Sequence, residues 1–257
     1  MRARATTRTP DARAAEAQMG CAGALWMFFK LPFTILRAAP QLGQFMRAEA
    51  ATTSGARVRA ATEALTAPDN PAAVAAALAG VSAHDPGFDL AATTHGVIRA
   101  RAIVSQARQD GDASAARRVL SDGLWRVFGL LLEGYAAHDA RRYESSAVAG
   151  TAVVSATRDQ LAEQLRLRLS CRGERYETAH GAILRGRLGP RAWDEDWIIR
   201  RSATATTPPG GGLLSGRCPQ CGAALEVSAD GSCAFCRALV LSGGHDWVVW
   251  SIEEGAW

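Results

Sequence analysis

The sequence predicts an α+β fold in which helices come first and antiparallel strands follow. Apolar residues recur at helical spacings as far as about residue 138, and beyond that point apolar and polar residues alternate with a period of two. Helices followed by a run of strands are typical of α+β proteins. Two Cys-x-x-Cys pairs late in the chain predict a small metal-bound insertion between strands. With 257 residues, the chain is long enough for one main core and a small appendage.

The N-terminal part divides into two segments. Residues 1–19 are rich in Arg, Ala and Thr without apolar periodicity, so we expect a disordered basic tail, and Met19 is an alternative start. Residues 20–48 carry a polar stripe at helical spacing and contain two prolines, which predicts an interrupted amphipathic helix rather than a membrane span. It would lie on a membrane surface or pack on protein. The candidate membrane contacts are Trp26, Phe28, Phe29, Lys30, Phe33 and Arg37.

Residues 49–71 are small, polar and end in Pro-Asp-Asn-Pro, which indicates a linker. Helices are expected over residues 72–81, 88–109 and 114–137, with Gly111 separating the last two. The apolar side of the third helix carries Val119, Leu124, Val127, Leu130, Leu131 and Tyr135.

Four strands are expected after the helices, over residues 148–157, 165–171, 193–201 and 246–252. The second has the clearest pattern, because Leu165, Leu167, Leu169 and Cys171 alternate with polar residues. Such alternation predicts a strand with one buried face and one solvated face.

The metal-binding segment is the most specific motif in the sequence. Cys218 and Cys221 form one C-x2-C pair, Cys233 and Cys236 form another, and eleven residues separate the pairs. Four thiolates make a tetrahedral shell that suits one structural Zn²⁺ and leaves no position for a catalytic water. A redox dithiol pair and an iron centre are the alternatives.

Composition bears on partners and compartment. The formal net charge is +4, but nearly all the basic residues are arginine and they are interleaved with acidic residues. This distribution indicates a solvated surface and makes nucleic acid an unlikely partner. No secretory signal is evident, and paired Cys-x-x-Cys motifs suit a reducing compartment. We therefore expect a cytoplasmic protein, with the inner face of the cell membrane as its candidate location.

Several motifs together resemble the bacterial Tim44-like proteins. The motif E-x-W-x-x-R is matched by Glu195, Trp197 and Arg200, and it is followed by C-P-x-C-G-A-x-L over residues 218–225. D-W-V-x-x-x-I then matches residues 246–252, and upstream D-P-x-F and G-D match residues 85–88 and 111–112. The resemblance covers roughly residues 84–257.

This resemblance implies an NTF2-like cone, in which a curved antiparallel sheet wraps around helices and encloses a pocket. The cone would occupy residues 72–206, with a zinc ribbon inserted over residues 212–240 and the last strand within residues 241–257. It also implies a binding role, since the mitochondrial namesake tethers an import motor to the inner membrane. The expected function is therefore a non-enzymatic, membrane-peripheral binding or scaffold module with a protein or lipid partner.

Two rival functions remain open. An NTF2-like pocket enzyme, an isomerase or hydrolase, would use a buried Asp or His with a perturbed pKa. A zinc-ribbon protein that binds nucleic acid would show salt-sensitive affinity. The candidate pocket residues are Trp193, Trp197 and Trp247, although aromatic residues on strands are as readily explained as core. Asp194, Glu195 and Asp196 are either acid–base groups or a solvated strand start. No arrangement of nucleophile and base is recognisable, so we expect no catalytic residue.

Overall fold

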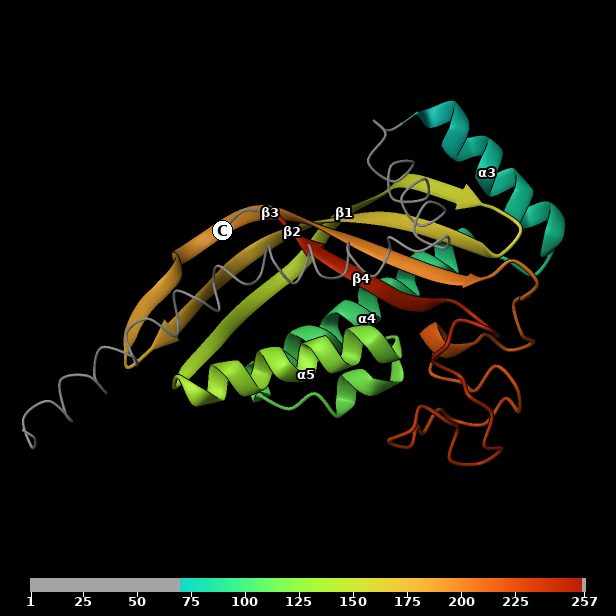
Figure 1. The fold of residues 1–257 in the computed structure, drawn as a ribbon. Helices are drawn as coiled ribbons and strands as arrows, with labels where there is room; N and C mark the ends of the chain where they lie inside the picture. The colour runs from blue at the N-terminus through green and yellow to red at the C-terminus, as the bar shows by residue number, and fades with distance from the viewer. Residues whose placement is uncertain (1–69, 256–257) are drawn as a thin grey trace, which may run out of the picture. The chain divides into compact units, whose positions relative to one another are not determined.

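The computed structural model describes residues 70–255. Its helices are α3 (Pro71–His84), α4 (Leu90–Asp110) and α5 (Asp122–Ala137), and its strands are β1 (Ala140–Arg158), β2 (Ala162–Ala179), β3 (Ala182–Ser202) and β4 (Val248–Glu254). Short 3-10 turns occupy Ala115–Arg118 and Leu213–Ser215. The helices therefore precede the strands, as an α+β fold requires (Figure 1). The predictions for residues 1–19 and 20–48, including the candidate membrane contacts, lie outside the described residues.

Side-chain caps set where the helices begin. Asn70 accepts hydrogen bonds from the backbone N–H groups of Ala72 and Ala73, and Pro71 takes the first helical position, where its missing N–H costs nothing. Pro71, the last residue of the linker expected over residues 49–71, is therefore the first residue of α3. Asp89 caps α4 in the same way, and Gly111 ends that helix with a φ of 70°.

The helix expected over residues 114–137 is interrupted, because its first turn pairs with the sheet. The backbone N–H of Ser121 donates to the Val249 carbonyl at 2.9 Å, and the N–H of Val249 donates to the Val119 carbonyl at 3.1 Å. This short parallel pairing covers the outer edge of β4. A new helix, α5, then starts with Ser121 as its cap, accepting from the N–H of Leu124.

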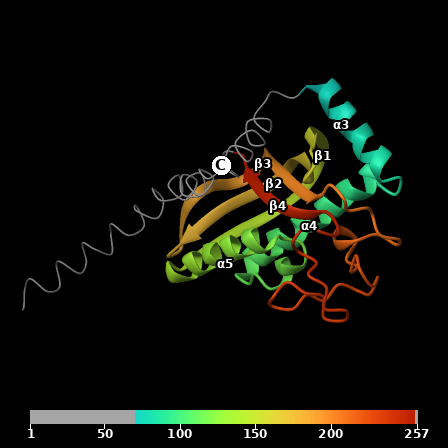
Figure 2. The same cartoon turned by 45° about the vertical axis from the view of Figure 1, so that its right-hand side comes forward.

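The sheet is antiparallel, and its strands lie in the order β1-β2-β3-β4. The first three strands are long and pair along most of their length, whereas β4 pairs only with residues 195–200 of β3. Figures 1 and 2 show the long strands bending over α4 and α5, which lie on the concave side of the sheet. This is a meander, in which each strand pairs with the next along the chain.

The expectation of an NTF2-like cone is wrong. The described residues form three α-helices and a four-stranded meander that lies on one side of α4 and α5 instead of closing around them. Where a cone would enclose a pocket, charged side chains from α4 and the sheet meet instead, including Arg101, Glu144 and Glu195. The polar alternation in β1 and β3 carries this charged layer, and it was not recognised in the sequence.

The main core lies between α4, α5 and the concave face. It contains Val97, Ala100 and Val104 of α4, Leu165, Leu167 and Leu169 of β2, and Trp197 of β3. The first three strands are longer than predicted, whereas β4 has the predicted length. In β1 the reason is that the N-terminal half has inward Arg142 and Glu144 where a core strand would have apolar residues. Among residues 70–255, no helix is long and apolar enough to cross a membrane.

Candidate metal centre and buried ion pairs

The four cysteines of the two C-x2-C pairs lie in two turns of matching geometry. In the first turn, the N–H of Gly222 donates to the Cys218 carbonyl at 2.9 Å, and the N–H of Cys218 donates to the Ala223 carbonyl at 2.9 Å. The second turn repeats both bonds fifteen residues later, from Arg237 to Cys233 and from Cys233 to Ala238, again at 2.9 Å. Gly222 has a φ of 72° and Arg237 a φ of 64°, so each turn is closed by a residue in the left-handed conformation at the equivalent position.

This geometry brings the four sulfur atoms together. The four Sγ atoms all lie within 4.8 Å of one another. Cys218 Sγ is 3.7 Å from Cys236 Sγ, and Cys221 Sγ is 4.0 Å from Cys233 Sγ. Cys218 and Cys233 are buried, whereas Cys221 and Cys236 are exposed. The cluster can hold a metal ion, as the spacing predicted.

The electrostatics at Cys233 favour the ligand form of the thiol. Burial acts to raise the pKa of Cys233, but backbone N–H groups of Cys236 and Phe235 point at its sulfur and bring the pKa down to about 7. Burial dominates at Cys218 and raises its pKa to about 12. A cation held between them would favour the deprotonated form of every ligand.

The cysteine segment has a small core and is anchored to the main unit. Leu213, Leu225, Val240 and Leu241 pack with two of the cysteines and with Val248 of β4. At its start, the Leu214 carbonyl accepts a hydrogen bond from Arg99 Nη2 of α4 at 2.8 Å. Farther along, the Ala229 carbonyl lies 3.4 Å from Arg117 Nη2. The segment is thus attached near α4, α5 and β4.

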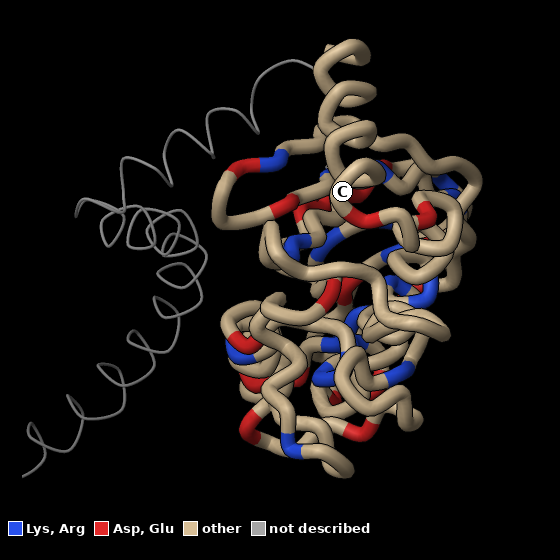
Figure 3. The backbone as a smooth tube through the Cα atoms, turned by 90° about the vertical axis from the view of Figure 1, so that its right-hand side faces the viewer, with Lys and Arg blue, Asp and Glu red and all other residues tan. Residues whose placement is uncertain are grey.

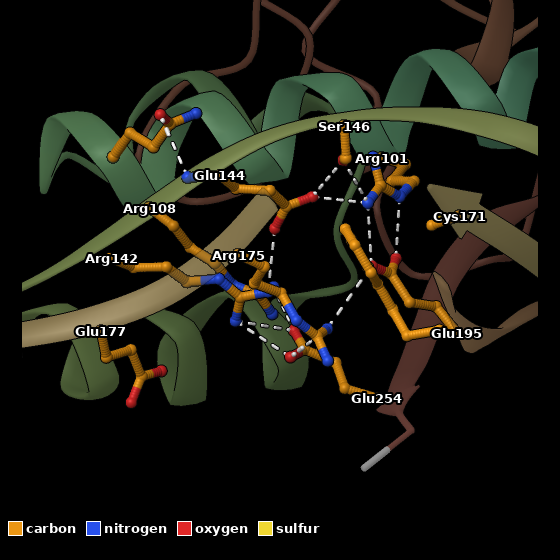
Figure 4. Close-up of polar contacts among 12 residues, drawn as sticks. Arg101, Arg108, Arg142, Glu144, Ser146, Cys171, Arg175, Glu177, Glu195 and Glu254 are labelled. Atoms are coloured by element: carbon orange, nitrogen blue, oxygen red, sulfur yellow. Dashed lines mark hydrogen bonds and ion pairs between the residues drawn. The ribbon is translucent and has the colours of Figure 1, made fainter. Parts of the chain in front are cut away.

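A second polar centre lies under the sheet, where arginine and glutamate side chains from α4 and the strands form ion pairs (Figure 4). Glu195 of β3 is its most fully bonded member. Its carboxylate accepts from Arg101 Nε and Nη2, each at 2.9 Å, and from the indole N–H groups of Trp193 at 2.8 Å and Trp197 at 3.0 Å. Two of the three predicted pocket tryptophans are therefore buried donors to a structural carboxylate.

The other carboxylates of the cluster, Glu144 and Glu254, also form ion pairs with arginine. Arg101 also bonds Glu144 at 2.5 Å, Arg142 bonds both Glu144 and Glu254 at 2.9 Å, and Arg108 pairs with Glu254. Burial acts to raise the pKa of Glu254, but the charges of Arg108 and Arg142 outweigh burial and bring it to about 2. The same balance lowers the pKa of Glu144, through Arg101 and Arg142. Glu254 and Glu144 are therefore held ionised. The prediction that Glu195 and Asp196 form a solvated strand start is wrong, since both are buried.

A third buried group surrounds Arg201. Its Nη1 donates to Asp85 at 2.7 Å, its Nε donates to Glu163 at 2.6 Å, and its guanidinium lies 4.5 Å from the ring centroid of Trp247. The Asp85 carboxylate also accepts from the Thr207 hydroxyl at 2.7 Å. These bonds tie the C-terminal end of α3 to the start of β2 and the end of β3.

The third predicted pocket residue, Trp247, does line a cavity. This half-open space of about 490 Å³ lies between the start of α4 and residues 207–215, with Asp246 in its wall. Burial raises the pKa of Asp246, although the N–H groups of Trp247 and Leu213 oppose the shift. The carboxylate accepts from Leu213 N–H at 2.6 Å, and a Cβ on Gly212 would lie only 1.7 Å from Asp246 Oδ2. Close backbone contact therefore fixes this acid.

The buried arginines were missed in the sequence. Arg101, Arg142, Arg175 and Arg201 are all less than one-tenth exposed. In an arginine-rich chain they look like surface residues, and the motif match singled out Arg200, which lies over the ring of half-exposed Trp250 instead. Period-two alternation of charge in β1 and the neighbouring Trp-x-Glu-x-Trp of β3 were the available signals.

No family model matches the chain, and no curated protein matches it. Among solved structures, the chain is similar to the crystal structure of the intermembrane space region of the chloroplast protein ARC6, with 11% identity and a TM-score of 0.35. The match covers 66% of this chain and 98% of that one. At this TM-score, the similarity does not establish a common fold.

Proposed function

We propose that this chain is a non-enzymatic binding module in which one structural Zn²⁺ holds residues 212–240 in place on the α+β unit. The convergence of Cys218, Cys221, Cys233 and Cys236 is the observation that carries this proposal. A tetrahedral shell with zinc–sulfur bonds of about 2.3 Å requires sulfur–sulfur distances of about 3.8 Å. The distances from Cys218 Sγ to Cys236 Sγ and from Cys221 Sγ to Cys233 Sγ, 3.7 and 4.0 Å, fit that requirement.

Zinc suits this donor set better than the alternatives do. A redox dithiol pair needs two cysteines, whereas here two matched turns aim four sulfurs at one point. Four cysteine ligands fill the shell, so the ion would supply stability and no open position for chemistry. The segment needs that stability, because only a handful of its side chains are buried.

The buried charges favour a structural unit over an enzyme. Glu144, Glu195 and Glu254 each face arginine, and the pKa values of Glu144 and Glu254 are lowered. A general acid or base needs a proton affinity near the working pH, which Glu144 and Glu254 lack. The motifs that resemble Tim44-like proteins also favour a binding role, although the sheet is not the cone which that resemblance implied.

One observation favours a second candidate function, a pocket enzyme. Asp246 lines the 490 Å³ cavity beside Trp247 and has a raised pKa, which is typical of an acid–base group. Its bond to Leu213 N–H and its contact with Gly212 give it a structural task as well. A screen of hydrolase and isomerase substrates, with Asp246→Asn as the variant, separates the two functions. Turnover that this variant abolishes would reject the binding module.

The membrane part of the proposal rests on sequence alone. Residues 20–48 would attach the module to the surface of an anionic membrane through their aromatic residues, with Lys30 and Arg37 near the phosphates. In the view of Figure 3, basic and acidic positions of the described part are interspersed, which does not favour a nucleic-acid surface. Flotation with anionic vesicles tests the attachment. Binding that survives Phe28→Asp with Phe33→Asp would reject it.

The metal part is tested by elemental analysis of gently purified full-length chain. We expect one zinc ion per chain, and none when Cys218 and Cys221 are both replaced by serine. Cys171→Ala is the matched control, because Cys171 is a buried cysteine outside the cluster and should leave the zinc content unchanged. Far-UV circular dichroism of the double variant should retain the sheet signal, since β3 and β4 are also held by the main core. Full-length chain without zinc would contradict the proposal.

A further inference from the structure

The outer face of α5 is the most conspicuous surface that the proposed function leaves unexplained. Phe128 and Leu132 point into the core, whereas Val127, Leu130 and Leu131 are 48%, 64% and 40% exposed. The apolar side predicted for this helix is therefore only partly covered, since Val119, Leu124 and Tyr135 contact the core and these three residues do not. With Gly134, which is also exposed, they recur at the i, i+3, i+4, i+7 spacing of a helical packing seam. An apolar stripe of this kind normally has a partner.

The charges beside this stripe indicate what the partner is. Arg126 and Glu133 are both exposed and lie seven residues apart, so they flank the same edge of the stripe at opposite ends. Neither makes an ion pair within residues 70–255. When a two-fold axis relates two antiparallel helices, the same edge of each stripe lies on the same side of the seam. Arg126 of one copy then lies opposite Glu133 of the other, and the pair occurs twice.

We propose that the chain forms a two-fold symmetric homodimer in which the α5 helices pack antiparallel, with the axis beside Gly129 and Leu130. This register places Leu130 against Val127 and Leu130 of the second copy. Gly123 and Gly134 lie near the two ends of the seam, and neither has any atom within 4 Å of the position a Cβ would take. Small residues at both ends of the seam allow the two backbones to approach closely. The seam is self-complementary in both shape and charge, as an isologous interface must be.

Surfaces at the two ends of α5 extend the interface. Its N-terminal end lies beside the cysteine segment, since Arg117 bonds both Asp122, at 2.5 Å, and the Ala229 carbonyl. Its C-terminal end lies beside the β2–β3 turn, where His180 Nδ1 is 3.9 Å from Asp139 Oδ2. Both places carry exposed apolar side chains, namely Phe235, Leu239, Ile183, Leu184 and Leu188.

An antiparallel pair brings the cysteine segment of each copy to the same end of the seam as the β2–β3 turn of the other. A single helix pair buries less than the roughly 800 Å² per partner of a standard interface. The additional apolar side chains bring the contact closer to that size. The seam of α5 itself does not depend on the metal, so this inference goes beyond the proposed function and is tested separately from it.

Sedimentation equilibrium of the full-length chain over a wide range of concentrations tests the dimer, with zinc content and circular dichroism as checks on folding. We expect a dimer that Leu130→Arg converts to a monomer. Arg126→Glu and Glu133→Arg, each alone, should raise the dimer dissociation constant by roughly tenfold, because two ion pairs become two repulsions. Combining the two substitutions restores the pairs with their signs exchanged. The double variant should therefore return to within about threefold of the unmodified chain.

Arg172→Glu is the matched control, since it makes the same charge change at an exposed residue on the opposite face of the sheet. It should leave the dissociation constant unchanged. A monomeric full-length chain would overturn the proposal, as would a dimer that survives Leu130→Arg. If each single charge variant weakens the dimer and the double variant weakens it further, the antiparallel register is wrong and the proposal fails. Loss of zinc without loss of the dimer would leave this inference standing and count only against the metal centre.

Discussion

Removal of the Glu195 carboxylate is expected to destabilise the protein severely. Glu195→Leu deletes the acceptor of four hydrogen bonds, two from Arg101 and one each from Trp193 and Trp197. The Glu195 and Arg101 side chains are 3% and 7% exposed, so the guanidinium loses a partner where water cannot replace it. Breaking a buried pair in this way costs about 3–5 kcal/mol. The two indole N–H groups, each worth roughly 1–3 kcal/mol when unsatisfied, make the lower end of that range a minimum.

Urea unfolding at neutral pH, followed by tryptophan fluorescence and circular dichroism, measures the loss. Arg101→Met alone should cost a similar amount, but the double variant should lose about 1–3 kcal/mol less than the sum, because neither charge is left uncompensated. Asp194→Asn is the control, since Asp194 is exposed and bonds only the Ser170 hydroxyl through its side chain. It should change stability by less than about 0.5 kcal/mol. If the effects of the two single variants add, or if Glu195→Leu lowers the free energy of unfolding by less than about 1 kcal/mol, the Arg101–Glu195 pair does not stabilise the protein as described.

Three further predictions concern pH, packing and the metal turns. Because the folded-state pKa of Glu254 is lowered from 4.5 to about 2, stability present above pH 4.5 should fall as the pH drops toward 2. The loss should reach up to about 3 kcal/mol in the free energy of unfolding. In urea titrations at several pH values, Glu254→Gln should make this free energy depend less on pH. Gly96→Ala should cost about 1–3 kcal/mol in thermal or urea unfolding, because its Cβ would lie 2.6 Å from Leu214 Cβ, whereas Gly129→Ala, with open space around it, should be neutral or stabilising. Gly222→Ala should weaken zinc affinity in competition with a chelator, since its φ of 72° disfavours a side chain. Arg237→Gly should strengthen the affinity for the same reason. A gain of affinity in the first variant, or a loss in the second, would contradict the assignment of the turns.

The cysteine cluster was predictable from the sequence because its determinants are local. Each C-x2-C turn fixes its own geometry through hydrogen bonds within six residues, so the spacing alone indicates where the sulfurs point. The strand over Leu165, Leu167 and Leu169 was predictable for the same reason, since its inward side chains are apolar and its outward ones polar. The α+β order of elements followed from the change of period.

The remaining features depend on contacts between residues far apart in sequence. Arg101 and Glu195 are 94 residues apart, and nothing near either one marks it as buried. If these ion pairs are not known, the sequence of β1 is too polar to be recognised as a core strand. The space under the sheet is then predicted to be an empty pocket. The outer face of α5 shows the opposite case, because its residues are apolar and yet exposed. Its apolar stripe is genuine, but periodicity does not tell whether the chain's own core or another molecule covers it.

Zinc K-edge X-ray absorption of the full-length chain distinguishes a closed structural zinc site from an open one. We expect a first shell of four sulfur atoms at about 2.3 Å with no nitrogen or oxygen scatterer, because Cys218, Cys221, Cys233 and Cys236 would occupy every position of a tetrahedral ion. A shell that contains oxygen or nitrogen, or fewer than four sulfurs, would contradict a closed structural site and reopen a catalytic role for the metal.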